Sequence, residues 1–437
     1  MTTWLSLLMV PALAGALPVD VTHQTLDNGL RIYLAPMDTP GIVAVQTWVD
    51  AGSGSEVLPG TTGHAHFLEH LLFTDTTLWP ATERDQLLRT TGTRENAWTW
   101  LDDTVYHQIL PAETLPALLR YEAERFQHVV LADPSVQREA GAVQGEWRQS
   151  QSWPSEALID GLYAAAFPAH PYGHSTLGTD EDVAAMPDAG ALVRDFKATW
   201  YRPSTIRLVV VGDFDPDATL AALGELWGDW AEPTQPLPEI PAQPAQLAPV
   251  SLEIPWDDPG TNPWAAVGWR VPARHPADPD SAALAILDEL LLSDIAPFRR
   301  ALLEVDPIAH DLGGKGWRFR DPHLFMVYVE LYPDVPQQAF FEALDAQLEA
   351  IRQGVDPELL AAVKARSSKA FQLGLDDPQR MAGVIGRATA VDPDPRALDG
   401  WMAALQAVTP QDLSGVVETY FVPQGRTQVV LAPPEAP

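Results

Sequence analysis

The same short pattern closes both halves of this 437-residue chain. A helix-like stretch leads to Tyr201 and then to the β-branched run Leu208–Val211, and a second leads to Tyr420 and then to Gln428–Leu431. A proline follows each tyrosine within three residues, and the two tyrosines stand 219 residues apart. Such a long-period recurrence indicates tandem duplication, with a chance repeat of a common helix–turn–strand connection as the alternative. Duplication predicts two copies of one fold.

A proline- and alanine-rich stretch divides the two copies. Residues 231–255 read AEPTQPLPEIPAQPAQLAPVSLEIP, without helical or strand periodicity, so we expect an extended linker between domains at 17–230 and 256–437. In the first copy, strands such as Ile42–Val49 are grouped apart from helices such as Pro134–Ser150. This grouping predicts an α+β fold of two homologous α/β-layer domains joined by the linker.

The first 16 residues predict a secretory signal peptide. Trp4–Leu17 is apolar and Ala14–Ala16 offers a small-residue cleavage site, although no Lys or Arg precedes the apolar run. The run is too short to cross a bilayer as a mature helix. We therefore expect a periplasmic or secreted protein that has no stable membrane span.

The net charge and the absence of cysteine exclude several classes of ligand and of active site. The net charge is −32, from 27 Lys and Arg against 59 Asp and Glu, and a surface of this sign repels nucleic-acid phosphates. The chain has no cysteine, which excludes disulfides, thiolate catalysis and cysteine-based zinc sites. Any metal must be held by histidines and carboxylates.

Two histidines and a glutamate share one helix-like segment, Gly63–Phe73. His66 and His70 are four apart, so both imidazoles leave one face of a helix at a spacing that suits two zinc ligands. Glu69 lies near that face, where a carboxylate can accept a proton from water activated by a metal. His64 points elsewhere, and we expect it at a solvent-exposed rim. The H-x-x-E-H order is the inverted zincin signature, and the alternative is a solvated helix with two histidines.

A catalytic zinc ion needs a third protein ligand and keeps one position open. The helix expected over Pro134–Ser150 offers Glu139 and Glu146, which are seven residues apart and so share one side. One can bind zinc while the other orients a histidine. The spacing alone does not choose between them, and an ordinary acidic helix is the alternative.

These residues carry a resemblance to a known family. The chain resembles the pitrilysin/insulinase family of zinc peptidases in its small two-domain bacterial form. The metal-binding motif of that family, G-x-A-H-F-L-E-H-x-x-F, is present here as Gly63, Ala65, His66, Phe67, Leu68, Glu69, His70 and Phe73. A second family segment is present as Gly92, Asn96, Ala97, Thr99, Thr104 and Tyr106. The resemblance covers most of residues 20–230 and extends more loosely over 256–437.

The resemblance implies a site that holds one zinc ion. It selects Glu146 as the third ligand, because the family places a glutamate 76 residues after the second histidine, and it places Glu139 in a supporting position. Glu69 is then the general base. The strand edge at Asn96 and Ala97 is expected to pair with the backbone of a peptide substrate. The implied fold is a pair of duplicate domains in a clam-shell-like assembly.

The second copy departs from the complete active sites of the family. Its equivalent helix carries Ala285–Leu290, without histidine, so it cannot bind zinc in the same way. Complete sites add an Arg and a Tyr from the second domain. Here Arg300 matches the Arg as a contact for the oxyanion or substrate, but His310 stands near the place of the Tyr. The resemblance implies a sister subunit that supplies Arg and Tyr, or a homodimer.

Two functions compete on this evidence. The first is an exported zinc-dependent endopeptidase that cleaves peptides or unfolded segments. The second is a non-catalytic or weakly active subunit that acts as a scaffold in a heteromeric peptidase. The chain keeps His66, Glu69, His70 and Glu146, a set from which inactive members of the family usually lose a histidine or the glutamate, and this favours the enzyme. A purely structural zinc site would fill four positions and leave Glu69 without a purpose.

Overall fold

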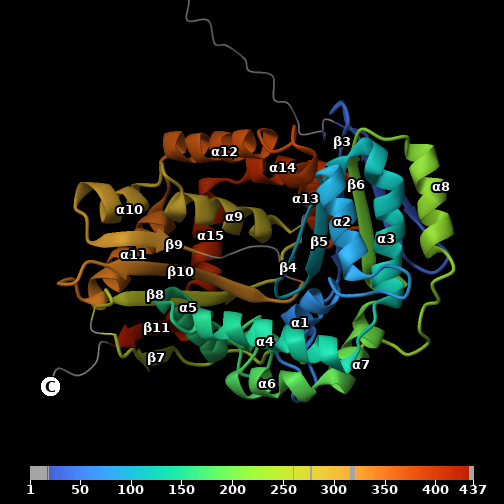
Figure 1. Ribbon diagram of the computed structural model, residues 1–437. Helices are drawn as coiled ribbons and strands as arrows, with labels where there is room; N and C mark the ends of the chain where they lie inside the picture. The colour runs from blue at the N-terminus through green and yellow to red at the C-terminus, as the bar shows by residue number, and fades with distance from the viewer. Residues whose placement is uncertain (1–16, 18, 259, 276–277, 315–319, 433–437) are drawn as a thin grey trace, which may run out of the picture.

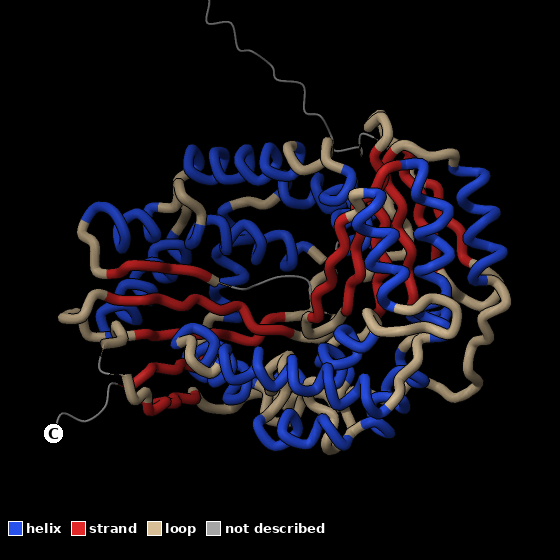
Figure 2. Tube along the Cα trace, in the orientation of Figure 1, coloured by secondary structure: helices blue, strands red, loops and turns tan. Residues whose placement is uncertain are grey.

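The computed structural model describes residues 17, 19–258, 260–275, 278–314 and 320–432. The signal peptide expected over 1–16 lies outside the described residues. Two domains lie side by side, each built from one sheet and its covering helices (Figures 1 and 2). In the described part of the chain, no helix combines the length and the apolar character needed to cross a bilayer.

The first sheet has six strands in the order β1-β2-β6-β3-β5-β4. Its β2–β6 pair is parallel and its other pairs are antiparallel. The strands are β1 (Thr22–Thr25), β2 (Arg31–Pro36), β3 (Ile42–Val49), β4 (Arg94–Thr99), β5 (Thr104–Pro111) and β6 (Ile206–Gly212). Among the residues that the structure describes, β4 therefore lies at an edge of the sheet and pairs with another strand on one side only.

The second sheet repeats this topology without a counterpart of β1. Its order is β7-β11-β8-β10-β9, again with one parallel pair, β7–β11, followed by antiparallel pairs. The strands are β7 (Val250–Pro255), β8 (Trp264–Val271), β9 (Ala309–Gly313), β10 (His323–Leu331) and β11 (Arg426–Ala432). The shared strand order confirms the predicted pair of homologous domains.

The recurring tyrosine pattern has a structural basis. In each domain a helix ends next to the tyrosine, a 3-10 turn starts at the following proline, and a central strand, β6 or β11, begins directly after it. The first-domain helices are α1 (His64–Leu71), α2 (Ala81–Thr91), α3 (Leu115–His128), α4 (Asp133–Ser150), α5 (Pro154–Ala166), α6 (Asp180–Ala185), α7 (Gly190–Trp200) and α8 (Pro216–Trp227). The second-domain helices are α9 (Pro279–Leu292), α10 (Pro297–Arg300), α11 (Gln337–Gln353), α12 (Pro357–Gln372), α13 (Pro378–Thr389), α14 (Ala397–Ala407) and α15 (Pro410–Tyr420).

The two domains exchange one helix each. α5, from the first half of the chain, packs on β7, β8 and β11 of the second sheet, and α13 packs on β3 and β6 of the first sheet (Figure 1). Leu158 and Leu162 of α5 are buried with Val429, and Ile385 of α13 is buried with Trp48. The backbone of α13 approaches so closely that a Cβ at Gly386 would lie 2.2 Å from the Trp48 ring. The exchange joins the domains into one interlocked body.

The linker expected over 231–255 differs from the structure at its C-terminal end. Val250–Pro255 forms the edge strand β7, paired in parallel with β11. Only Val250 and Ile254 of this strand are partly buried, and the other residues are exposed, so the segment has no strong apolar alternation. Its strand structure comes from pairing with β11 and from packing under α5, and both contacts are remote in sequence.

Candidate metal centre

Helix α1 is fixed in place by its apolar face. Phe67, Leu68 and Leu71 are fully buried, as is Leu72 just beyond the helix, in the core beneath the first sheet. Burial of side chains of this size contributes roughly 1.5–3 kcal/mol each. The opposite face of α1 carries the candidate ligands and meets α4.

The N-terminus of α1 is held by a buried carboxylate. Both oxygens of Glu56 accept hydrogen bonds from the backbone, at 2.7 Å from Gly63 N and 2.7 Å from Ala65 N. Gly63 has a φ of 81°, and a Cβ there would lie 2.4 Å from the Leu177 carbonyl oxygen, so only glycine fits. Burial raises the pKa of Glu56, although the two hydrogen bonds oppose this shift. Glu56 was not among the site residues expected from the sequence.

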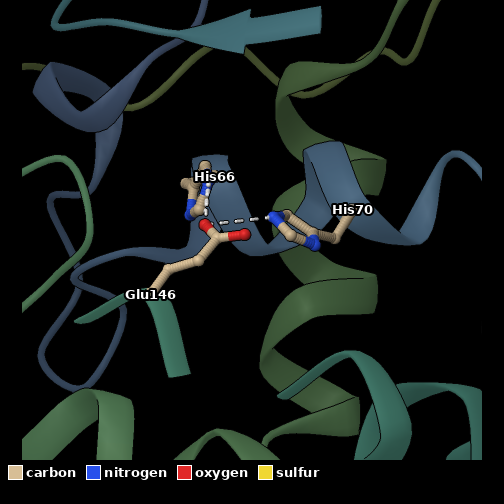
Figure 3. Close-up of side chains that lie close together, drawn as sticks. All are labelled: His66, His70 and Glu146. Carbon is tan, nitrogen blue, oxygen red and sulfur yellow. Dashed lines mark ion pairs between the residues drawn. The ribbon is translucent and has the colours of Figure 1, made fainter. Parts of the chain in front are cut away.

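The two histidines of α1 converge on Glu146 of α4 (Figure 3). His66 Nε2 lies 3.4 Å and His70 Nε2 lies 3.6 Å from Glu146 Oε2. One ligand atom from each of the three residues lies within 4.8 Å of the others. The histidine side chains are 14% and 20% exposed and that of Glu146 is 47% exposed, so the cluster is reachable from solvent. Two imidazoles and one carboxylate form the donor set of a catalytic zinc site.

Glu139 lies near His70, on the side away from Glu146. It lies on α4 with its Oε2 3.8 Å from Nδ1 of His70, the ring nitrogen that does not face Glu146. A carboxylate at that nitrogen fixes the orientation of a ligating imidazole. Burial lowers the pKa of His66 to about 3, and the neighbouring His70 adds to the shift. His66 is therefore neutral at ordinary pH, the form that binds a metal.

Glu69 lies on α1 between the two histidines in sequence, directly before His70. It is 8% exposed, and its Oε2 accepts a 2.6 Å hydrogen bond from the Thr99 hydroxyl at the end of β4. Burial raises the pKa of Glu69 to about 7, against the Thr99 hydrogen bond and with a contribution from the charge of Glu146. A buried carboxylate whose pKa lies near neutrality suits a general base.

Family models match both halves of the chain. Residues 34–180 match the model described as "Insulinase (Peptidase family M16)", and residues 191–367 match the one described as "Peptidase M16 inactive domain". The first match contains every residue of the metal cluster. The chain belongs to the insulinase family, peptidase family M16.

Known proteins similar to this M16 chain have the same fold. The zinc protease PqqE of Helicobacter pylori is 26% identical over 94% of this chain and 92% of its own. A crystal structure of a protease from Helicobacter pylori superposes with a TM-score of 0.89 at 24% identity, over 95% of this chain and all of that one. The periplasmic protease PqqL of Escherichia coli gives a TM-score of 0.76 at 22% identity, over 96% of this chain and 48% of its own.

The strand that we expect to bind substrate lies at an edge of the first sheet. In the described part of the chain, β4 pairs with β5 and with no other strand. On this strand, the Asn96 side chain accepts a 2.9 Å hydrogen bond from the backbone N–H of Ala97. A side chain thus caps a backbone donor of an edge strand, which an incoming peptide strand would otherwise engage.

His64 and Arg300 lie in surroundings that differ from those expected from the sequence. His64, expected at a solvent-exposed rim, is fully buried at the first turn of α1, with its ring edge-on to Phe67 at 6.2 Å. Arg300 is not brought to the metal cluster, because it lies on α10, well separated from α1 (Figure 1), and pairs with Glu304 at 3.0 Å. Its side chain is 54% exposed. In this structure, Arg300 therefore lies apart from His66 and His70.

Proposed function

We propose that this chain is a zinc-dependent endopeptidase that cleaves peptides or unfolded segments. The observation that carries the proposal is the convergence of His66, His70 and Glu146 beside a buried Glu69. These three ligands would hold one zinc ion and leave a position open to solvent, as a catalytic rather than a structural site requires. When bound, the zinc ion supplies Lewis-acid polarisation of water and of the scissile carbonyl.

Glu69 acts as the general base in this proposal. Its carboxylate accepts the proton of the attacking water and returns it to the nitrogen of the leaving amine. Thr99 fixes one carboxylate oxygen, so the other remains to exchange the proton. The pKa of Glu69, raised to about 7 by burial, favours a group that takes up and releases a proton within one cycle.

The substrate backbone binds along β4. An extended peptide would displace the Asn96 side chain from Ala97 N–H and add a strand to the open edge. Because β4 ends at Thr99, which contacts Glu69, a peptide on this edge is delivered to the general base. Backbone pairing of this kind selects extended or unfolded segments rather than folded domains.

We infer that a second chain completes the active site. Arg300 is exposed and paired with Glu304, away from α1, so the Arg and Tyr of complete family sites would come from a sister subunit or from a second copy of this chain. Preorganised donors to a developing oxyanion are each worth about 2.7–4 kcal/mol. The chain alone should therefore bind zinc fully yet cleave slowly. Full activity of the purified monomer, lost in Arg300→Ala, would contradict this assignment.

A scaffold subunit is the second candidate function. The second half matches a domain described as inactive, and its helix α9 carries no histidine. Against it, the first half keeps both histidines together with Glu69, Glu139 and Glu146, which a scaffold has no need to retain. The proposed catalytic function therefore rests on the first half alone.

Export is part of the proposal. The apolar run before Leu17 has the character of a signal peptide. PqqL of Escherichia coli, which has this fold, is described as periplasmic. We expect the mature protein to begin near Leu17 and to be found outside the cytoplasm. N-terminal sequencing of the native protein decides this, and an intact Met1 on cytoplasmic protein would contradict it.

Digestion of an unfolded protein tests the function. Zinc-loaded protein is incubated with a reduced, unfolded protein, and the products are identified by mass spectrometry. Internal peptides with new termini, lost after chelation and restored by zinc, are expected. Absence of cleavage by the zinc-loaded protein, alone and with its sister subunit, would support the scaffold instead.

A further inference from the structure

A cavity of about 770 Å³ lies between the two domains, next to the end of β4. One wall comes from the first domain and includes Trp48, Trp98 and Thr99, and the other comes from the second domain and includes Arg274 and Arg387. The rings of Trp48 and Trp98 meet edge to face at 5.9 Å, which gives the cavity a rigid apolar wall. A pocket of this size that combines apolar walls with charged groups is typical of a ligand site.

The charge of the cavity opposes that of the protein. Four arginines line it, Arg207, Arg274, Arg320 and Arg387, against three aspartates, Asp50, Asp102 and Asp103. The formal balance of these seven groups is therefore +1, in a chain whose net charge is −32. A cationic, partly enclosed site in an acidic protein concentrates anions where the rest of the surface repels them.

Most of these charges are already paired. Arg207 donates to Asp50 at 2.5 Å, and Asp50 also pairs with Arg31 at 2.5 Å. Asp102 accepts a 2.5 Å hydrogen bond from the hydroxyl of Tyr172 and lies 3.6 Å from Arg320. These pairs hold the cavity walls in place and leave little capacity to bind a ligand.

Arg387 differs from these paired arginines. It lies near the end of α13, partly buried, and among the described residues its guanidinium has neither a hydrogen bond nor an ion pair. Burial lowers the pKa of Arg387, and Asp103 opposes this shift only from beyond ion-pair distance. Burial likewise raises the pKa of Asp103 to about 7, so this aspartate is a weak counter-ion near neutral pH. The five guanidinium donors of Arg387, with no acceptor among the described residues, are therefore available to an anionic group that enters the cavity.

We propose that this cavity binds a carboxylate of the peptide substrate against Arg387. The inference rests on the proposed peptidase function, which it refines by naming a substrate class. Thr99 links the two sites, because its residue lines the cavity while its hydroxyl bonds to Glu69. A peptide lying along β4 therefore places a residue near its scissile bond into the cavity. The carboxylate is that of an acidic side chain or of the peptide C-terminus.

Binding of three matched peptides to uncleaving protein tests the assignment. The probes are fluorescein-labelled, alanine-rich peptides of about ten residues, long enough to extend along an edge strand. The first has a central Glu and an amidated C-terminus, the second a central Gln and a free C-terminus, and the third a central Gln and an amidated C-terminus. The protein is the full zinc-loaded chain with Glu69→Gln, and fluorescence polarisation gives the dissociation constants.

One of the two peptides that carry a carboxylate should bind at least about 10-fold more tightly than the neutral peptide. The identity of that peptide shows whether the cavity binds an acidic side chain or the C-terminus. Adding Arg387→Gln should reduce this preference to less than about 2-fold, and Arg387→Lys should retain part of it. Arg396→Gln is the matched control, because Arg396 is 81% exposed and pairs with Asp394. If circular dichroism shows that Arg387→Gln does not fold, the Arg387→Lys variant and the comparison of the three peptides still test whether the cavity binds a carboxylate.

Equal binding of all three peptides, or a preference that survives Arg387→Gln, would overturn the cavity assignment. Failure of the proposed function looks different. Wild-type zinc-loaded protein would then leave every peptide intact while the binding preference for carboxylate persisted. Cleavage without any carboxylate preference would instead keep the peptidase and remove the cavity as a substrate site.

Discussion

The Thr99 hydroxyl donates a 2.6 Å hydrogen bond to Oε2 of Glu69, and this contact joins the end of the edge strand β4 to the metal-bearing helix α1. The proposed general base is therefore oriented by the same strand that is proposed to hold the substrate. The two proposed functions of the site, binding an extended backbone and moving a proton, share one structural element.

Thr99→Val should lower kcat about 10-fold with KM and zinc content little changed. The valine keeps the shape of the side chain but removes the donor, so Glu69 loses its orientation while the ligands remain. Thr99→Ser keeps the hydroxyl and should recover most of the activity. Steady-state kinetics with metal analysis check this, and a Thr99→Val enzyme with wild-type kcat would remove the positioning role.

Glu146→Gln should lose zinc affinity more severely than Glu139→Gln. Glu146 Oε2 faces Nε2 of both histidines, whereas Glu139 contacts only the far nitrogen of His70. A carboxylate that orients a ligand typically changes metal affinity by about 10–100-fold, and loss of a direct ligand costs more. Competition with a chromophoric chelator measures both variants. The reverse ranking would move the third ligand to Glu139.

Glu56→Ala should lower the free energy of unfolding by about 1–3 kcal/mol and weaken zinc binding. It leaves the backbone N–H groups of Gly63 and Ala65 without acceptors inside the protein, and these groups hold the start of α1. Glu56→Gln keeps one acceptor and should cost less. Denaturant unfolding checks this against the control Glu113→Ala, since Glu113 is exposed. Equal stability of Glu56→Ala and the control would contradict the capping role.

Asp288 should make the protein less stable as pH rises. It is 7% exposed on α9, and burial raises its pKa to about 7, with Glu289 adding to the shift. The folded state then keeps a proton that the unfolded state loses above about pH 4, so stability falls between about pH 4 and pH 7. Asp288→Asn removes this loss, and its stability relative to wild type should rise by about 1–4 kcal/mol from pH 5 to pH 8. The exposed control Asp334→Asn should show no such trend. A pH-independent difference between Asp288→Asn and wild type would contradict the shift.

The metal cluster was accessible to sequence reasoning because its geometry is local. Two histidines four apart must share a helix face, and Glu139 and Glu146 must share another, so only the meeting of α1 and α4 was left to tertiary structure. The duplication was accessible for a similar reason. The turn after each tyrosine is a local motif, and it marks the start of the central strands β6 and β11.

The features that were missed depend on contacts between distant segments. The strand β7 owes its structure to β11 and α5, and its own sequence is mostly exposed. His64 is buried because neighbouring segments close over the first turn of α1, which a helical wheel does not show. The exchange of α5 and α13 between domains follows no local period. Arg300 was placed by a motif, but the position of α10 relative to α1 is set by the whole second domain.

The activity of zinc-loaded Glu69→Gln protein is the sharpest test of the proposed role of Glu69 as general base. The amide has nearly the size of the carboxylate but cannot accept the proton, and loss of a general base typically costs about 10²–10⁴ in rate. Zinc content and kcat/KM are measured on the same sample, under conditions in which the wild type cleaves an unfolded peptide. We expect full zinc occupancy with a fall in kcat/KM of that order. Full occupancy with turnover close to the wild type would contradict the assignment of Glu69 as the general base.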